Sequence, residues 1–294
     1  MSIPMDTHCI NCQLQRNLKL VRSLGSEEKA TEFIRRWMAL FLEQPPEAPS
    51  PCMDPKTSQL LYEMYGVPLD RYHAEKDQAN RFAFAHLEDV RQRVEIAQDP
   101  VYAGLQFAIL GNYLDFSALQ GKVSFQDLQQ MLDKANDISF DADTYASFRE
   151  TLAKSRALLY LTDNAGEIVF DRVLAEKLHK AYPDLAITFC VRGGIAANDA
   201  TREDAAAAGI PFPVIDNGNL VTGTYPELLG KEAKEAFENS DVIFSKGMGN
   251  AETLLGCGKN IYYAFLVKCE HFSEMMQKPL MTPMLLHEGE QPQI

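Results

Sequence analysis

The chain of 294 residues is 46% hydrophobic, which is enough to bury a large core in one big domain or two smaller ones. Its formal net charge of -13 argues against a nucleic-acid-binding surface, because phosphate backbones are bound by clustered Lys and Arg side chains. No run reaches the roughly 18 apolar residues of a membrane span, and the N-terminus lacks a basic segment followed by an apolar one. We therefore expect a cytoplasmic protein that binds neither nucleic acid nor a membrane.

Six cysteines in a chain of this length are typical of reduced thiols and not of a disulfide scaffold. Cys9 and Cys12 form one CxxC motif, but no second pair follows at the spacing of a zinc ribbon. The motif therefore leaves a metal-binding, a redox and a purely structural role open.

Residues 1–154 predict a helical subdomain. Residues 26–43 carry apolar side chains at a 3.6-residue period, with Ser26 as the expected N-cap. Prolines then interrupt the chain, and a new helix is expected to start at Asp54-Pro55. A long polar helix is expected over about 72–98.

Residues 101–114 are apolar almost all round, which predicts a helix buried in the middle of this half. Its end carries Asn112, and Asp115 follows. Buried polar side chains of this kind either cap the next turn or face a site. Residues 124–127 have the pattern of a capping box, so we expect a helix to start there and another to end at about Lys154.

From about residue 155 on, short apolar runs alternate with helical patterns, which is typical of a parallel sheet covered by helices on both faces. The expected fold class is α/β, with a Rossmann-like doubly wound parallel sheet in residues 155–294. The usual strand order would be 3-2-1-4-5, although the sequence does not show the order. The Met- and Pro-rich tail from Gln277 on is expected to be irregular or partly disordered. The expected strands are residues 157–162, 186–191, 213–215, 242–245 and 261–267.

A polar cluster follows the first of these strands. Asp163, Asn164 and Glu167 lie between a buried strand and a helix, and the carboxyl ends of strands in open α/β sheets face the ligand crevice. Three oxygen-bearing side chains at this place favour a hard cation or a polar substrate over packing. The alternative is that the aspartate only caps the following helix beside a glycine turn.

Polar groups follow three further strands. After the second, Asp199 is either an N-cap or a metal ligand. After the fourth, residues 247–250 form a glycine-rich turn whose backbone N–H groups suit a phosphate, although it matches neither a P-loop nor a dinucleotide fingerprint. After the fifth comes Lys268, whose charge can neutralise an anion at the same edge.

Together, these loops supply what the cleavage of a phosphate ester requires. Carboxylates and a carboxamide can hold a hard divalent metal ion, backbone amides can bind phosphate, and a lysine can balance the charge of its oxygens. Chance seldom places such complementary groups on one rim of a sheet. We therefore predict metal-dependent cleavage of a phosphate ester.

Several motifs, taken in this order, are specific although each alone is not. They are Gly111-Asn112-Tyr113-Leu114-Asp115-Phe116, Thr162-Asp163-Asn164-Ala165-Gly166-Glu167, Asn198-Asp199-Ala200-Thr201 and Lys246-Gly247-Met248-Gly249-Asn250. In this combination the chain resembles the damage-control phosphatase family, formerly domain of unknown function 89, and Cys9-Ile10-Asn11-Cys12 is similar to the start of its stand-alone prokaryotic members. The resemblance covers nearly the whole chain. It implies a helical N-terminal subdomain packed on a Rossmann-like domain, and a metal-dependent phosphatase of sugar phosphates or damaged phosphometabolites.

The resemblance also implies roles for individual residues. Asp163, Asn164 and Asp199 would hold a divalent metal ion, with Mg, Mn, Co or Ni as candidates. Asp163, Asp199 and Lys268 are the expected catalytic residues. The expected substrate contacts are Asp163, Asn164, Glu167, Asn112, Asp115, Gly247, Met248, Gly249, Asn250 and Lys268.

The chain departs from parts of that family. Its Asp-Asn-Ala-Gly-Glu motif lacks the extra residue that precedes the Glu in eukaryotic members, and Leu266-Val267-Lys268 stands where one subfamily has Arg-Thr-x-Lys. The substrate range of that subfamily therefore cannot be transferred to this chain. The oligomeric state is left open.

Alternatives remain for the mechanism and for the class of protein. Either a water activated by the metal attacks the phosphorus, or Asp163 or Asp199 attacks it directly and forms an aspartyl-phosphate. A SAM-dependent methyltransferase could use the same kind of sheet, but the first loop here is rich in carboxylates and has a single glycine. A non-catalytic sugar-phosphate binding module would keep the phosphate cradle and would not need metal ligands.

Overall fold

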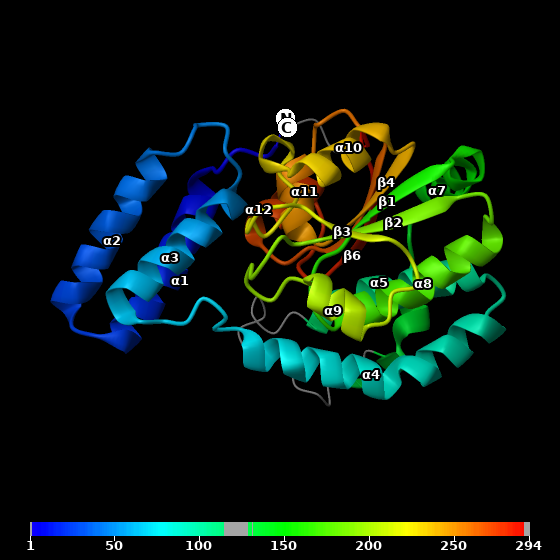
Figure 1. The fold of residues 1–294 in the computed structure, drawn as a ribbon, viewed down its shortest axis with the longest axis horizontal. Helices are drawn as coiled ribbons and strands as arrows, with labels where there is room; N and C mark the ends of the chain where they lie inside the picture. Colours follow the sequence, from blue (N-terminus) through cyan, green and yellow to red (C-terminus); the bar gives the residue numbers. More distant parts are fainter. Residues whose placement is uncertain (1, 115–128, 131, 291–294) are drawn as a thin grey trace.

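The computed structural model describes residues 2–114, 129, 130 and 132–290. Among these residues, six strands form one sheet in the order β3-β2-β1-β4-β5-β6 (Figure 1). Strands β1 to β5 are parallel, and β6 is antiparallel to β5. The expected α/β class and the usual order of the first five strands are confirmed. The strands are β1 (Ala157–Leu161), β2 (Ala186–Val191), β3 (Val214–Asp216), β4 (Val242–Lys246), β5 (Ile261–Leu266) and β6 (Pro283–His287).

Strand β6 corrects the expectation for the tail after Gln277. The described part of this tail is not irregular throughout, because Pro283 to His287 pair along β5, with Met284 opposite Phe265. Pro283 is the first residue of an edge strand, a position at which its missing N–H is tolerated. The composition of the tail suggested disorder, but the neighbouring strand supplies the partners that this short segment cannot supply for itself.

The N-terminal half is helical in its described residues, as expected. Ser26 caps α2 by accepting a hydrogen bond from the backbone N–H of Lys29 at 3.3 Å. The expected start at residues 124–127 and the side chain of Asp115 lie outside the described residues. The helices of this half are α1 (Thr7–Leu24), α2 (Glu27–Leu42), α3 (Asp54–Tyr65), α4 (His73–Ile96), α5 (Pro100–Leu110) and α7 (Ala142–Lys154), with 3₁₀ turns η1 (Ser50–Met53), η2 (Gly111–Leu114) and η3 (Ala135–Asp137).

In the second half, helices connect the strands. Helix α8 links β1 to β2, α9 links β2 to β3, and the remaining helices follow in the same alternation up to β6. The helices are α8 (Glu167–Ala181), α9 (Arg202–Ala207), α10 (Lys231–Asn239), α11 (Met248–Leu254) and α12 (Glu270–Met276), with a 3₁₀ turn η4 (Pro226–Leu228).

Helices cover both faces of the sheet. One face packs against α5, α7, α8 and α9, with α4 outside them against α5 and α8, and the other face packs against α10, α11 and α12 (Figure 1). Helices α1, α2 and α3 lie to one side and bury their own apolar cluster around Phe33 and Trp37. In contrast, Leu105 of α5 and Phe148 of α7 belong to the same core as Leu158 of β1. The division of the chain at residue 154 stays a prediction.

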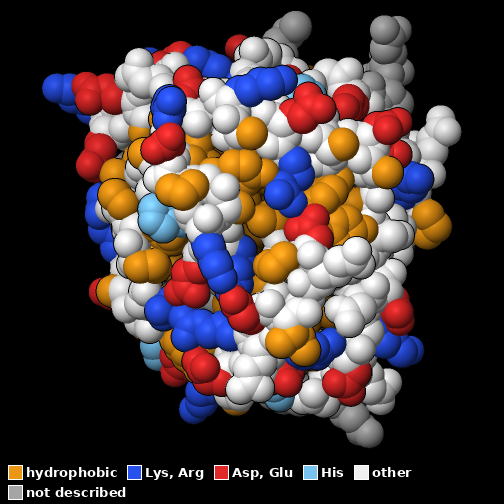
Figure 2. Space-filling model, turned by 90° about the vertical axis from the view of Figure 1, so that its right-hand side faces the viewer, with side chains coloured by type: hydrophobic (Ala, Val, Ile, Leu, Met, Phe, Trp, Pro, Cys, Tyr) orange, Lys and Arg blue, Asp and Glu red, His pale blue; other side chains and the backbone are white. Residues whose placement is uncertain are grey.

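Acidic and basic side chains share one face of the described surface (Figure 2). Within the described ranges, no helix combines the length and the apolar content that crossing a membrane requires. Figure 2 shows the face that is turned away from α1, α2 and α3, where Lys and Arg side chains alternate with Asp and Glu. The basic side chains on this face therefore lie next to acidic ones.

Candidate active site

The candidate site lies where the strand order of the sheet reverses. Strand β1 lies between β2 and β4, so the chain first builds the sheet on one side of β1 and then on the other. In open α/β sheets, the loops that leave such a switch point diverge and form a crevice for ligands at the carboxyl ends of the strands. The loops after β1, β2 and β4 are therefore in position to build one site.

Gly166 makes the turn between β1 and α8. Its φ is +77°, and a Cβ on this residue would lie 2.7 Å from the carbonyl carbon of Ala79, so only glycine fits. Helix α8 starts at Glu167 with Gly166 as its N-cap and without a side-chain capping bond. Asp163 therefore does not cap this helix, and the interpretation of that residue as an N-cap is wrong.

Two asparagines hold two carboxylates together in this turn. Nδ2 of Asn112 donates to Oδ2 of Asp163 at 2.7 Å and to Oε2 of Glu167 at 2.9 Å. Nδ2 of Asn164 donates to the same two oxygens at 2.6 and 2.9 Å. All four side chains are buried. The 3₁₀ turn after α5 thus brings Asn112 to the residues that follow β1, as the sequence suggested.

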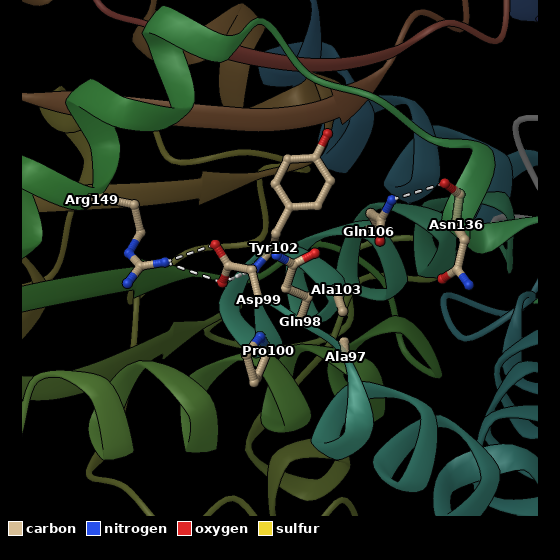
Figure 3. Close-up of a pocket in the computed structure, with 9 residues that line it drawn as sticks. All are labelled: Ala97, Gln98, Asp99, Pro100, Tyr102, Ala103, Gln106, Asn136 and Arg149. Atoms are coloured by element: carbon tan, nitrogen blue, oxygen red, sulfur yellow. Dashed lines mark hydrogen bonds and ion pairs between the residues drawn. The ribbon is translucent and has the colours of Figure 1, made fainter.

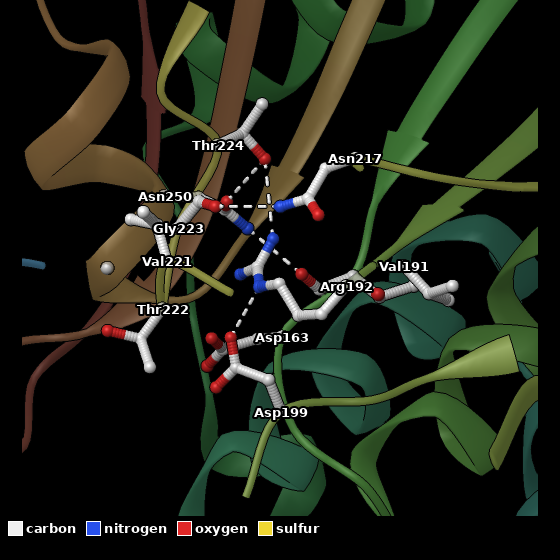
Figure 4. Close-up of polar contacts among 12 residues, drawn as sticks. Asp163, Val191, Arg192, Asp199, Asn217, Val221, Thr222, Gly223, Thr224 and Asn250 are labelled. Atoms are coloured by element: carbon white, nitrogen blue, oxygen red, sulfur yellow. Dashed lines mark hydrogen bonds and ion pairs between the residues drawn. The ribbon is translucent and has the colours of Figure 1, made fainter. Parts of the chain in front are cut away.

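Asp199 reaches the same place from the loop after β2. Thr201 caps α9 and forms a capping box of its own, so Asp199 is not the N-cap. The backbones of Asn164 and Asp199 form a β-bridge, and Nε of Arg192 donates to Oδ2 of Asp199 at 2.5 Å. Figure 4 shows the carboxylates of Asp163 and Asp199 side by side beneath the guanidinium of Arg192. The three expected metal ligands therefore converge.

Burial and like charge disfavour the ionised form of Asp163. Burial raises the pKa of this carboxyl well above its ordinary value, and the nearby Glu167 and Asp199 raise it further. Lys268 and Arg192 act in the opposite direction and offset the shift only in part. The surrounding protein therefore favours the protonated form of this carboxyl, and a cation bound beside it would favour the ionised form.

Lys246 is a buried residue whose importance the sequence interpretation missed. Its Nζ donates to Oδ1 of Asp171 at 2.9 Å and to the carbonyl of Ala108 at 2.8 Å, and it also pairs with Oε1 of Glu167. Burial alone would lower the pKa of Lys246, but Asp171 and Glu167 outweigh this effect and raise it. Burial raises the pKa of Asp171 to about 7, although Lys246 opposes the shift. A lysine at the end of an apolar strand could have signalled buried acidic partners.

The glycine-rich turn after β4 approaches Asp163 directly. Gly247 has a φ of +83°, and a Cβ on it would lie 2.0 Å from Cγ of Asp163. The N–H of Gly247 donates to the carbonyl of Ala264 at 3.0 Å, so this amide does not supply the phosphate contact expected from the sequence. Met248 and Gly249 are the first residues of α11, where N–H groups have no partner within the helix. These two amides remain candidates for an anion contact.

Asn250 ties three segments together. Its Nδ2 donates to the carbonyls of Thr162 at 2.9 Å and Lys246 at 2.6 Å, and its Oδ1 accepts from Oγ1 of Thr224 at 2.8 Å. Nη1 of Arg192 also donates to Oγ1 of Thr224, at 3.4 Å, as Figure 4 shows. Asn250 is fully buried, so its bonds fix the ends of β1 and β4 relative to Arg192. A direct substrate contact by this residue stays a prediction.

Arg192 was also missed as a functional candidate. It follows β2 directly and is 1% exposed, and it is the guanidinium that links Asp199 to Thr224. The sequence did contain a signal. Arg192 directly follows an apolar strand and comes shortly before Asp199, and an arginine that is buried needs an acidic partner. Lys268, which was expected in the site, follows β5 by two residues and is half-buried.

A cavity of 890 Å³ lies away from this site, around the start of α5. Its charged groups are already paired, because Nη1 of Arg149 donates to both carboxylate oxygens of Asp99 at 3.1 Å (Figure 3). Asp99 also caps α5 through the N–H groups of Val101 and Tyr102. None of the expected site residues lines this cavity, which is lined by Ala97, Gln98, Asp99, Pro100, Tyr102, Ala103, Gln106, Asn136 and Arg149.

Comparisons with known proteins agree on one family. The model of the damage-control phosphatase ARMT1-like domain matches residues 5–282. An uncharacterised protein of Methanocaldococcus jannaschii is 34% identical over 218 residues, which cover 70% of this chain and 69% of that protein. A damage-control phosphatase of Archaeoglobus fulgidus is 33% identical over 214 residues, which cover 71% of this chain and 73% of the relative.

Two further comparisons concern Pyrococcus horikoshii. A damage-control phosphatase of this organism is 32% identical over 178 residues, which cover 60% of this chain and 61% of the relative. The crystal structure of a family protein with domain of unknown function 89 from the same organism has a TM-score of 0.81 at 24% identity, and the match covers 97% of this chain and 99% of that one. This likeness shows a shared fold over nearly the whole length.

Proposed function

Because the chain belongs to the family of the damage-control phosphatase ARMT1-like domain, we propose that it is a metal-dependent phosphomonoesterase of small phosphorylated metabolites. The observation that carries the proposal is the buried carboxylate of Asp163 beside Asp199 and Glu167. A divalent ion would balance this charge, and a phosphoryl group would in turn be drawn to the ion. Sugar phosphates and damaged phosphometabolites are the proposed substrates.

Asp163, Asn164 and Asp199 are the proposed metal ligands. Their carboxylate and amide oxygens are the donors that Mg²⁺ and Mn²⁺ prefer, and Co²⁺ and Ni²⁺ are further candidates. Nδ2 of Asn164 donates to the neighbouring acids, whereas its Oδ1 accepts from Asn198 at 2.8 Å and keeps a second lone pair. The donor set therefore fits a hard divalent ion.

The chain's own groups would orient and stabilise the reacting phosphate. A bound divalent ion supplies Lewis-acid polarisation of the phosphoryl group and activation of a water. The ammonium of Lys268 would balance the charge of the phosphoryl oxygens, and the amides of Met248 and Gly249 would donate to them. Arg192 would keep the carboxylate of Asp199 in position through its hydrogen bond.

The identity of the nucleophile separates two versions of this mechanism. In one, a water attacks the phosphorus and the leaving alkoxide takes up a proton. In the other, an oxygen of Asp163 or Asp199 attacks, and the aspartyl-phosphate is hydrolysed in a second step. Trapping a phospho-enzyme, or finding oxygen from labelled water in a carboxylate after one turnover, supports the second version.

Asn112, Glu167 and Asn250 are proposed to hold the other groups of the site in position. Each is fully buried and hydrogen-bonded to other residues of the site. Supporting residues of this kind fix the orientation of the groups that bind the metal, and their loss usually reduces affinity or activity by about 10- to 100-fold.

Release of phosphate from an aryl phosphate tests the proposed function. We expect the full-length protein to release phosphate with Mg²⁺, Mn²⁺, Co²⁺ or Ni²⁺, and to stop when a chelator is added. The Asp163→Asn variant should be inactive, whereas Asp184→Asn should match the parent because Asp184 is 83% exposed. Binding of phosphate without turnover under all these conditions would instead assign a non-catalytic binding module.

A substrate panel then sharpens the assignment. Sugar phosphates, phosphopantetheine and nucleotides are compared at equal concentration with each of the four metals. We expect the highest kcat/KM on small phosphorylated metabolites. Activity confined to nucleotides would contradict the proposed substrate class.

A further inference from the structure

Side chains that can bind metals gather where the start of α1 meets the start of α12. The chain has six His and six Cys, and five of these twelve fall within residues 6–12 and 269–271, which together are ten residues long. The two helices pack against each other although they are far apart in the sequence. Neither stretch contributes a ligand to the proposed phosphatase site.

Asp6, His8 and His271 lie close enough together to hold one metal ion. Oδ2 of Asp6 lies 2.9 Å from Nδ1 of His8 and 3.2 Å from Nδ1 of His271. One ligand atom from each of the three residues lies within 4.8 Å of the others. Two ligand atoms around one tetrahedral zinc ion are roughly 3.3 Å apart, given metal–ligand bonds of about 2.0–2.1 Å. The spacing therefore fits a single small ion without rearrangement of the backbone.

His271 meets Asp6 through one of its two ring nitrogens. Its Nδ1 faces Asp6, whereas its Nε2 at the other edge of the ring is buried and has no hydrogen-bond partner among the described residues. An ion held by Nδ1 would leave Nε2 to an ordered water, which is the usual partner of such a buried atom. The ring centroid of His271 lies 5.5 Å from that of His8, which keeps the nitrogens of both rings near Asp6.

We propose that Asp6, His8 and His271 bind a divalent transition-metal ion of the zinc class, at a site separate from the one at Asp163. Two imidazoles and a carboxylate form a common set of protein ligands for zinc, with a water in the fourth position. The half-exposed surroundings of His8 and Asp6 leave room for that water. Mg²⁺ prefers oxygen ligands, so it would not compete at this site.

The ion would connect two distant parts of the chain. Asp6 and His8 lie at the start of α1, whereas His271 lies in the first turn of α12. Lys268 precedes α12 by two residues. A metal at this position would therefore fasten the N-terminal helix to the segment that leads out of the sheet at β5. The free thiols of Cys9, Cys12 and Cys269 lie on the same two helix starts and can bind zinc on their own, so the test must separate them.

Equilibrium dialysis against zinc tests the proposal on the full-length Asp163→Asn protein, in which the other proposed metal site is disabled. We expect one zinc ion per chain, retained in a large excess of Mg²⁺. His271→Gln and His8→Gln should each weaken zinc binding by more than about 100-fold, since losing even an outer partner of a ligand costs about 10- to 100-fold. His86→Gln, on α4 against Phe82, should bind as the parent does.

Each outcome of this test decides the proposal. His8 is exposed, so His8→Gln remains informative if His271→Gln fails to fold. Unchanged zinc binding in both variants overturns the proposal. Loss of the ion in Cys12→Ser together with full retention in His8→Gln assigns the ion to the thiols and overturns it as well. None of these readouts depends on phosphatase activity.

Discussion

Two groups of carboxylates lie at the same edge of the sheet, and they differ in the side chains that surround them. In the lysine cluster, Glu167 and Asp171 surround the buried Lys246, which donates to both of them. In the aspartate pair, Asp163 and Asp199 lie side by side, and burial with like charge raises the pKa of Asp163 well above normal. In the first group one lysine donates to both acids, whereas in the second Arg192 donates to Asp199 and amide side chains donate to Asp163.

The difference supports the proposal that Glu167 and Asp171 build the site and that Asp163 and Asp199 bind the metal. A buried ion pair adds little net stability but is costly to break, so the lysine cluster fixes the position of β4 beside α8. The amides of Asn112 and Asn164 bridge the two groups, because each donates to both Asp163 and Glu167. We therefore propose that the lysine cluster holds the aspartate pair in place through these amides. The predictions below test this division.

The largest expected effect is at Asp163. In Asp163→Asn we expect kcat/KM to fall by about 10³-fold or more, because a charged ligand of the metal is lost. The parent should gain about 2.7 kcal/mol of stability when a divalent metal is present at a hundredfold excess over its Kd, and the variant should gain none. Phosphate release and urea unfolding with and without Mn²⁺ measure the two quantities.

Asp171→Asn is the matched control, since it also replaces a buried carboxylate at this edge. It should lose stability but keep the stabilisation by metal. If metal no longer stabilises Asp171→Asn either, the two groups do not act separately and the division fails.

The next largest effect is expected at Lys246. In Lys246→Met, Glu167 and Asp171 lose their buried cation, and the free energy of unfolding should fall by about 3–5 kcal/mol. Urea unfolding measures the change. Lys154→Met, at a site that is 77% exposed, should stay within about 0.5 kcal/mol of the parent.

A triple variant separates lost charge from lost packing. Lys246→Met combined with Glu167→Gln and Asp171→Asn removes all three charges, so most of the lost stability should return. If the triple variant is no more stable than Lys246→Met, charge balance is not what the lysine cluster contributes.

The sequence predicted the fold well because the signals for it are local. The alternation of apolar runs with helical patterns is sufficient for a doubly wound sheet, and a glycine between a strand and a helix is sufficient for a tight turn at Gly166. Residues that follow strands directly, such as Asp163 and Asp199, could be assigned to one edge because parallel strands end together. Strand β6 was missed because its pairing with β5 is not encoded in its own composition.

What the sequence could not show is how the side chains are paired. Lys246 and Arg192 were visible as charged residues at strand ends, yet their acidic partners come from α8 and from the loop after β2. The same limit applies to Gly247, whose amide was expected to face a phosphate and instead donates to Ala264 of β5. Such contacts depend on the register between strands, which a single sequence does not contain.

A smaller effect is expected at Lys268, which lowers the pKa of Asp163 without forming part of the lysine cluster. In Lys268→Met we expect kcat/KM to fall by about 10²-fold, because the charge that balances the phosphoryl oxygens is lost. The Kd for Mn²⁺ should change little, and Lys268→Arg should recover part of the activity. Steady-state kinetics and metal titration measure these changes. A loss of metal binding equal to the loss of activity would place Lys268 with the supporting groups instead.

The smallest expected effect is the pH dependence of the metal-free protein. The pKa of Asp163 in the folded state is raised above the ordinary value of 3.8, so the native state keeps a proton that the unfolded chain releases above about pH 4. This contribution to stability is full below that pH and is lost as the pH rises toward the raised folded pKa, with a slope of at most about 1.4 kcal/mol per pH unit. Asp171, whose pKa is raised to about 7, adds a slope of the same sign.

Comparison of the parent with Asp163→Asn isolates the contribution of the aspartate pair, because Asp171 is present in both proteins. Urea unfolding between pH 5 and pH 8, without metal, should show a shallower decline in the variant. With saturating Mn²⁺ the contribution of Asp163 to this decline should vanish in the parent, since the metal-bound native state and the unfolded chain both carry the deprotonated carboxylate in this pH range. Equal slopes in parent and variant would mean that Asp163 titrates as an ordinary aspartate. The protein would then have balanced this charge by itself, and the aspartate pair would not differ from the lysine cluster in the way proposed here.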